Sequence, residues 1–233
     1  MFALLKSSGT PSQRHAATYG FDSMAAEFGT VQLYVLLTEA LCRGDWYETA
    51  EAALAGGARA IQLREKELAD IELLDRARRI RELCERHEAL LIVNDRPDIA
   101  LAAGAHGVHL GLKDPPVSEA RRILGDKYII GVSTHTVEQA KAALTDLPDY
   151  VAVGPMFASH TKPQDRIAGP ETLSAVRRLT SLPLVAIGGI TMENAAQCAP
   201  ADVLAVCSAV ISVDDVASAT RELMETSFRT EDE

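Results

Sequence analysis

Three polar side chains recur at every second position of the segment QLREK. Gln62, Arg64 and Lys66 are spaced by two, so in an extended chain they project from one face. Two cations on one face are costly to bury unless an anion or a carboxylate meets them. The spacing predicts a clamp on an anionic substrate. The alternative is a salt-bridged strand end in which Glu65 or Glu67 is the partner.

Two aspartates, Asp95 and Asp114, each follow an apolar run. Mg²⁺ takes one or two carboxylates together with water and phosphate oxygens, so a converging pair would suit it. Taken alone, Asp95 is more typical of a helix N-cap, and Asp114 of a turn before the Pro-Pro pair that follows it. The cations of QLREK and Lys162 favour the metal interpretation, because acid groups would hold Mg²⁺ and basic groups the same diphosphate.

A second anion site is predicted near Gly188 and Gly189. Glycine lets the backbone approach an anion closely, and Thr191 is placed to cap a helix whose N–H groups would bind phosphate. Ser208 follows the last apolar run. A bare Gly-Gly pair is also typical of a tight turn.

The histidines give no clear nucleophile–base pair. His135 lies two residues after Ser133, where it fits either a general base or a residue that shapes a helix entry. His109 is predicted to pack among apolar neighbours.

Eight short apolar runs separated by helical patterns must position these groups. The runs are at 31–37, 58–64, 89–94, 106–111, 128–132, 149–154, 183–188 and 201–206. Strands that alternate with helices form a parallel sheet, and eight of them close a single (β/α)8 TIM barrel. Such barrels carry their chemistry at the carboxyl ends of the strands and often bind phosphate after strands seven and eight. The alternative, an open doubly wound sheet, lacks the GxGxxG that would follow its first strand.

Length and composition limit the organisation and the partners. The 233 residues suit one barrel catalytic domain over 29–233, preceded by a flexible N-terminal extension over 1–28 with weak periodicity. A net charge of −10 without a basic stretch argues against nucleic acid or an anionic membrane as a partner. No apolar run is long enough to span a bilayer, and four cysteines without a CxxC pair favour a cytoplasmic location. The oligomeric state is left open.

Six motifs in order resemble the thiamine phosphate synthase family, also called thiamine-phosphate pyrophosphorylase. They are QLREK, NDRPDIALAAGAHGVHLGLKD, GVSTHT, GPMFASHTK, AIGGI and AVCSAV, spread over about residues 31–212. The resemblance implies a transferase that joins 4-amino-2-methyl-5-(diphosphooxymethyl)pyrimidine to 4-methyl-5-(2-phosphooxyethyl)thiazole, giving thiamine phosphate and diphosphate with Mg²⁺. Three departures from the family's motifs are Leu112 for a common Gln, Ser159 for the usual Thr, and non-glycine residues before the last strand.

The same resemblance implies a role for each matching residue. The pyrimidine diphosphate would be bound by Gln62, Leu63, Arg64, Glu65, Lys66, Asn94, Ser133 and Lys162. The thiazole phosphate would be bound by Ser159, His160, Thr161, Gly189, Cys207 and Ser208. The metal ligands would be Asp95 and Asp114, and the catalytic cations Arg64, Lys66 and Lys162.

Two other functions fit part of this pattern. A thiazole tautomerase resembles the chain at NDR, at the histidine after the fifth strand and at Gly-Gly, but its members tend to lose the pyrimidine-diphosphate set. Retention of Lys66, Asp114, Ser133 and Lys162 favours the synthase. A non-catalytic thiazole- or thiamine-phosphate binding protein is the third possibility, and the metal pair argues against it.

Overall fold

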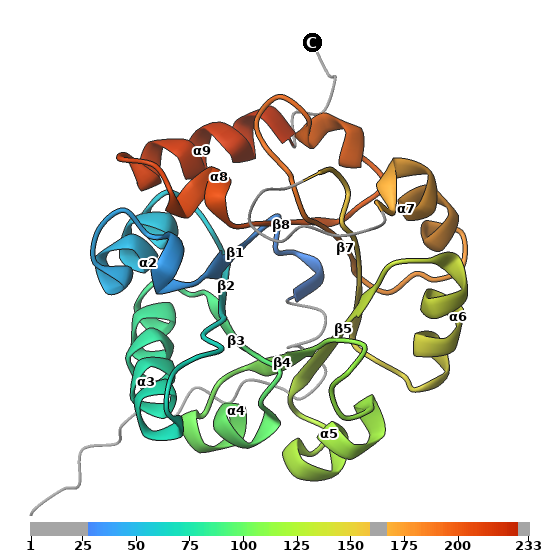
Figure 1. Ribbon diagram of the computed structural model, residues 1–233, viewed down its shortest axis with the longest axis horizontal. Helices are drawn as coiled ribbons and strands as arrows, with labels where there is room; N and C mark the ends of the chain where they lie inside the picture. Colours follow the sequence, from blue (N-terminus) through green and yellow to red (C-terminus); the bar gives the residue numbers. More distant parts are fainter. Residues whose placement is uncertain (1–27, 159–166, 228–233) are drawn as a thin grey trace, which may run out of the picture.

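Eight short strands pair in sequence order and close into a parallel barrel in the computed structural model, which describes residues 28–158 and 167–227 (Figure 1). The strands are β1 (Leu33–Leu37), β2 (Ala60–Leu63), β3 (Leu90–Asn94), β4 (Gly107–Leu110), β5 (Ile129–Thr134), β6 (Tyr150–Val153), β7 (Leu184–Ile187) and β8 (Val203–Val206). The ring closes where Leu33 of β1 lies opposite Leu204 of β8. The predicted (β/α)8 TIM barrel is confirmed, and each strand lies within its predicted run apart from β5, which extends two residues further.

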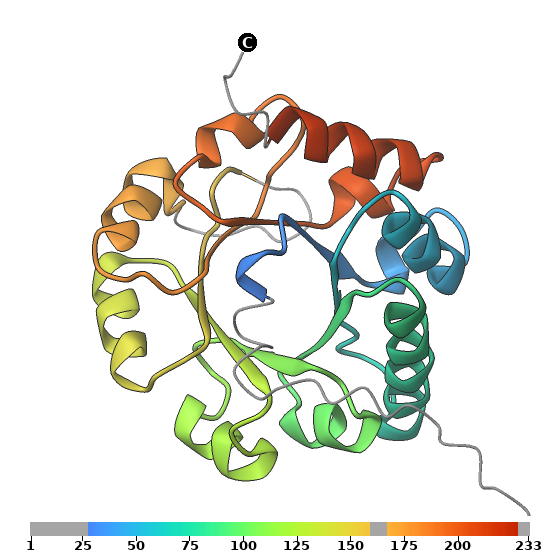
Figure 2. The same ribbon diagram turned by 180° about the vertical axis from the view of Figure 1, so that it is seen from behind.

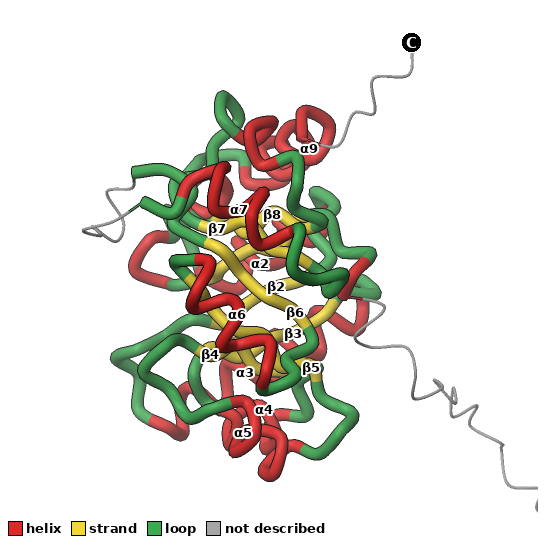
Figure 3. The backbone as a smooth tube through the Cα atoms, turned by 90° about the vertical axis from the view of Figure 1, so that its right-hand side faces the viewer, coloured by secondary structure: helices red, strands yellow, loops and turns green. Residues whose placement is uncertain are grey.

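Helices cover the barrel on the outside, as Figures 2 and 3 show from behind and from the side. They are α2 (Trp46–Ala55), α3 (Asp70–Arg86), α4 (Pro97–Ala103), α5 (Val117–Leu124), α6 (Val137–Thr145), α7 (Gly169–Arg177), α8 (Ser208–Ile211) and α9 (Val216–Ser227), with 3-10 turns η1 (Glu39–Leu41) and η2 (Ala195–Cys198). On α3, apolar residues at helical spacing are buried against the strands. Within the described part of the chain, no helix has both the length and the apolar character to span a membrane.

One predicted helix start is found in the structure, and another is not. Thr136 caps α6 as predicted, because its hydroxyl accepts from the Gln139 N–H at 3.2 Å. The helix expected after Thr191 is replaced by turns and η2. There Asn194 accepts from the Thr191 N–H and donates to the Gly189 carbonyl, so side-chain hydrogen bonds hold the turns that compete with a helix. The Thr191 hydroxyl donates to Glu193 instead of to a cap.

Side chains alternate along each strand between two apolar cores. One core lies between the strands and the helices, and the other fills the inside of the barrel. Ile61 and Leu63 of β2 belong to the outer core, whereas Ala60 lies in the inner one.

The first described residues enter the barrel before β1 begins. Figures 1 and 2 show this segment, in blue, inside the ring of strands. Phe28 is fully buried there, although the sequence placed it in the extension. Its ring stacks on Tyr150 with centroids 4.1 Å apart and meets Tyr34 edge-on at 5.5 Å. The packed domain therefore starts no later than residue 28, while residues 1–27 of the predicted extension lie outside the described ranges.

Candidate active site

The polar residues of β2 follow the alternation predicted from their spacing. Gln62 is 1% exposed and points into the barrel, where its Nε2 donates to Tyr34 Oη at 2.7 Å. Arg64 comes directly after β2 and is half-buried, with its main-chain N–H bound to the Leu37 carbonyl. Lys66 is exposed, and its Nζ lies 3.1 Å from Asp95 Oδ2. The strand thus places one amide inside the barrel and two cations at its end.

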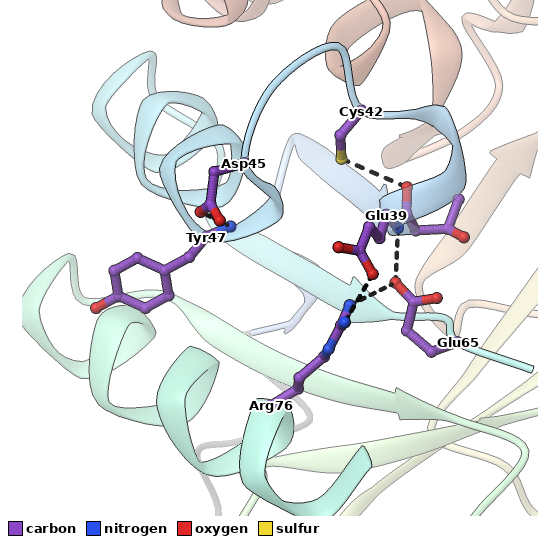
Figure 4. A network of polar contacts seen from close by, with 7 residues as sticks. Glu39, Cys42, Asp45, Tyr47, Glu65 and Arg76 are labelled. Atoms are coloured by element: carbon purple, nitrogen blue, oxygen red, sulfur yellow. Dashed lines mark hydrogen bonds and ion pairs between the residues drawn. The ribbon is translucent and has the colours of Figure 1, made fainter. Parts of the chain in front are cut away.

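The two intervening residues of QLREK serve the scaffold. Leu63 is buried in the outer core. Glu65 accepts the Glu39 N–H at 2.6 Å and pairs with Arg76, whose Nη1 is 3.6 Å away (Figure 4). Burial raises the pKa of the Glu65 carboxyl. Contacts of Leu63 and Glu65 with a ligand would therefore come from their main chain. The ion-pair alternative paired Glu65 with a cation of QLREK, whereas in the structure its partner is Arg76.

The carboxyl ends of β3 and β4 bring Asp95 and Asp114 together. Their side chains hydrogen-bond to each other, Lys66 meets Asp95, and the Gly111 N–H donates to Asp114 at 2.6 Å. Burial acts to raise the pKa of each carboxyl. At Asp95 the hydrogen bonds to Asp114, Lys66 and Asn94 outweigh burial, so the pKa of Asp95 is lowered. At Asp114 the neighbouring Asp95 adds to the effect of burial, so the pKa of Asp114 is raised. When both carboxyls are ionised, their two charges beside one ammonium give the cluster a net negative charge.

Asp95 also has an unusual backbone. Its φ is +64°, in the left-handed region that costs a non-glycine residue conformational energy. Its N–H donates to the His109 carbonyl across the sheet, which holds the strained residue in place. Among the described residues no group of three or more His, Cys, Asp or Glu side chains is gathered that could hold a metal, so this pair is the acidic cluster of the site.

Asn94 and Ser133 are half-buried near the ends of β3 and β5. Asn94 hydrogen-bonds Asp95, and Ser133 Oγ lies 2.8 Å from His109 Nε2. His109 is 5% exposed, which confirms its packed position, and burial lowers its pKa to about 4. The imidazole is thus neutral near pH 7. His135 binds the Gly154 carbonyl through Nδ1, which ties β5 to β6.

The described residues of the second predicted anion site lie at the ends of β7 and β8. Gly188 and Gly189 have φ of +96° and +69°, and a Cβ on Gly189 would lie 2.6 Å from the Phe157 carbonyl oxygen. Only glycine fits this close approach of two loops. Cys207 is half-buried after β8, and Ser208 is exposed at the start of α8. Burial raises the pKa of the Cys207 thiol to about 11, against the opposing effect of the Arg64 charge.

Four predicted residues, Ser159, His160, Thr161 and Lys162, lie outside the described residues. The chain leading to them is placed, because the Phe157 N–H donates to the Gly188 carbonyl at 3.0 Å.

Two tyrosines inside the barrel, Tyr34 and Tyr150, were not predicted from the sequence. Both occupy inward positions of strands. The available signal was the glycine at position 131, whose absent side chain makes room for the Tyr150 ring.

Comparisons with known proteins agree on one family. The family described as thiamine monophosphate synthase matches residues 33–210. The thiamine-phosphate synthase of Chloroflexus aurantiacus is 45% identical over 196 residues, covering 82% of this chain and 90% of that protein. The one from Moorella thermoacetica is 48% identical over 197 residues, covering 83% and 94%. The solved thiamine phosphate pyrophosphorylase of Pyrococcus furiosus superposes with a TM-score of 0.79 at 36% identity, covering 86% of this chain and 96% of that one.

Proposed function

Because the chain belongs to the thiamine monophosphate synthase family and is a transferase that forms thiamine phosphate, we propose that it does so with Mg²⁺ held by Asp95 and Asp114. The observation that carries this proposal is the contact between the two carboxyls beside Lys66.

The donor set fits Mg²⁺. The ion takes one or two carboxylates and completes its octahedron with water and phosphate oxygens. Without a cation, the hydrogen bond between Asp95 and Asp114 needs a proton on one of the two carboxyls. When bound, the ion would neutralise charge on a leaving diphosphate.

The remaining charges suit the same diphosphate. Arg64 and Lys66 follow β2, Lys66 lies beside Asp95 of the acidic pair, and Lys162 is proposed to join them. Positive groups fixed where negative charge develops lower the barrier more than they stabilise the ground state. Gln62, Asn94 and Ser133 would orient the pyrimidine, with the main chain of Leu63 and Glu65 beside them.

The chemistry then needs no protein nucleophile. The bond between the pyrimidine methylene carbon and its oxygen breaks, and the electron pair leaves on the diphosphate. The thiazole ring nitrogen bonds to that carbon and gives thiamine phosphate. Positioning and electrostatics supply the acceleration, which agrees with a site rich in charge.

The thiazole phosphate is proposed to bind at the ends of β7 and β8. Gly189 lets the loop after β7 approach the Phe157 carbonyl closely, Cys207 precedes the short helix α8, and Ser208 begins it. The loops after strands seven and eight, with a short extra helix, are where many barrels bind phosphate. Ser159, His160 and Thr161 would complete this subsite. The cytoplasm is the compartment proposed for this reaction.

The test is a coupling assay with both phosphorylated heterocycles, with and without Mg²⁺, on the wild type and Asp95→Asn. Asparagine keeps the shape of aspartate and tolerates positive φ, so folding is expected to persist. Turnover should fall at least about a hundredfold because one charged ligand is lost. Mg²⁺ with diphosphate should raise the melting temperature of the wild type and not that of the variant.

Asp75→Asn on the exposed face of α3 is the matched control and should behave as the wild type. Full Asp95→Asn turnover at limiting Mg²⁺ would contradict the metal assignment. Metal-independent isomerisation of the thiazole phosphate, without thiamine phosphate, would instead favour a tautomerase.

A further inference from the structure

A chain of side-chain hydrogen bonds crosses the barrel interior between two residues assigned above to the pyrimidine diphosphate. It runs from Gln62 on β2 through Tyr34, Tyr150 and His109 to Ser133 on β5. The successive donor–acceptor distances are 2.7, 3.2, 2.8 and 2.8 Å. The first four residues are each at most 5% exposed, so water does not compete for these bonds.

The orientation of the Gln62 amide sets the direction of this hydrogen-bond chain. An amide nitrogen only donates, so Tyr34 Oη accepts from Gln62 and gives its own proton to Tyr150. Tyr150 then donates to His109 Nδ1, and the Nε2–H of the neutral imidazole donates to Ser133 Oγ. The hydroxyl protons of Tyr34 and Tyr150 and the Nε2–H of His109 each have an acceptor in this direction, as burial requires. Turning the Gln62 amide over would reverse each bond in turn.

The direction decides what the two ends offer to a ligand. With one Nε2–H engaged, the amide of Gln62 keeps Oε1, which accepts hydrogen bonds, and a second Nε2–H, which donates them. With its oxygen accepting from His109, the Ser133 hydroxyl keeps its proton to donate. The hydrogen-bond chain thereby fixes the orientation of two groups at once, the acceptor Oε1 of Gln62 on β2 and the donor hydroxyl of Ser133 on β5.

Packing around Tyr150 holds the middle of this hydrogen-bond chain in place. The Phe28 ring stacks on Tyr150 at an interplanar angle of 13°. On another side, a Cβ at Gly131 would lie 1.8 Å from Tyr150 Cζ, so the tyrosine fills the space that this glycine leaves. The Tyr150 hydroxyl is therefore held between Tyr34 and His109.

We propose that Tyr34, Tyr150 and His109 are positioning residues of the reaction, which hold Gln62 as an acceptor and Ser133 as a donor toward the pyrimidine diphosphate. The proposal rests on the proposed function, since that assigns both ends to the substrate.

Tyr150→Phe tests it by keeping the stacked ring and removing the central hydroxyl. The kcat/KM for the pyrimidine diphosphate should fall about tenfold, the effect of one misplaced hydrogen bond. The KM for the thiazole phosphate should stay within about twofold, which general damage to the barrel would not allow. Tyr34→Phe should act in the same way and gives an independent test if the first variant folds poorly.

Tyr47→Phe is the matched control, since the Tyr47 hydroxyl binds Arg86 on the surface, away from the barrel interior. Its kinetics should equal those of the wild type. If the wild-type protein forms no thiamine phosphate, the proposed function itself is refuted. An active wild type beside a folded Tyr150→Phe variant with unchanged kinetics would refute the positioning role alone.

A double-mutant cycle shows whether the effect passes through Ser133. If it does, Tyr150→Phe combined with Ser133→Ala should lose no more than Ser133→Ala alone, within about twofold. Losses that multiply in this cycle, and equally in the cycle of Tyr150→Phe with Gln62→Ala, would show independent effects at both ends and overturn the proposal.

Discussion

Replacing Phe28 by alanine tests how the barrel is closed from within. Phe28 is fully buried, stacked on Tyr150 and edge-on to Tyr34, and the strands surround it. Alanine would remove the ring and leave a cavity, because strands that are paired on both sides cannot move in to fill it.

The size of the effect follows from burial and packing. A buried Phe→Ala change costs about 3–5 kcal/mol of unfolding free energy, which includes the lost aromatic contacts. For a domain of this size each kcal/mol shifts the melting temperature by about 2–4 °C, so the expected fall is roughly 6–20 °C. Phe28→Leu, which refills most of the space, should cost about 1 kcal/mol.

Thermal and guanidinium unfolding of the variants gives the answer. Ile71→Ala is the control, because Ile71 is 73% exposed and should change stability by no more than about 0.5 kcal/mol. If Phe28→Ala unfolds at the same temperature and denaturant concentration as Ile71→Ala, Phe28 does not seal the barrel.

The remaining predictions concern pH and two glycines. The pKa of His106 is lowered to about 4 by burial, and its Nδ1 accepts the Leu91 N–H. The unfolded chain therefore binds more protons between about pH 4 and 6.5, so stability falls as pH drops through that window, by at most about 3 kcal/mol. Urea titrations from pH 4 to 7 should show a weaker pH dependence for His106→Asn, and an equal one would contradict this origin. Gly131→Ala should displace the Tyr150 ring and reduce both stability and turnover, which unfolding and coupling assays would measure; wild-type values for both would contradict the packing. Gly189→Ala should raise the KM for the thiazole phosphate by pushing two loops apart, and an unchanged KM would remove Gly189 from that subsite.

The sequence predicted the barrel because its evidence is local. Strands buried on both faces are continuous apolar runs, and α3 repeats its apolar residues at helical spacing. A strand–helix alternation that repeats eight times is then compatible with only a few fold topologies. The segment after β7 forms turns where a helix was predicted, because the Asn194 side chain binds neighbouring backbone groups. Such side-chain bonds compete with the helix, and the helix-capping pattern of the sequence does not show them.

The site was predicted less completely. Spacing by two predicted a shared face for Gln62 and Lys66, although not that Gln62 would lie inside the barrel, and adjacent strand ends predicted that Asp95 meets Asp114. The links through Tyr34 and Tyr150 join strands far apart in the sequence, so no local pattern shows them. Their existence depends on which side chains meet across the closed ring.

The alternation in QLREK has a consequence for how substitutions at neighbouring positions are interpreted. Glu65 accepts the Glu39 N–H and pairs with Arg76 (Figure 4). The Arg76 guanidinium in turn lies over the Trp46 ring, 4.8 Å from its centroid. A growth-based mutational scan would score positions 64 and 65 alike, one through lost substrate binding and the other through lost folded protein. Only Glu65 should be rescued by a compensating change at Arg76. Among diverging relatives, position 65 is expected to vary together with the scaffold around it, and position 64 with the substrate.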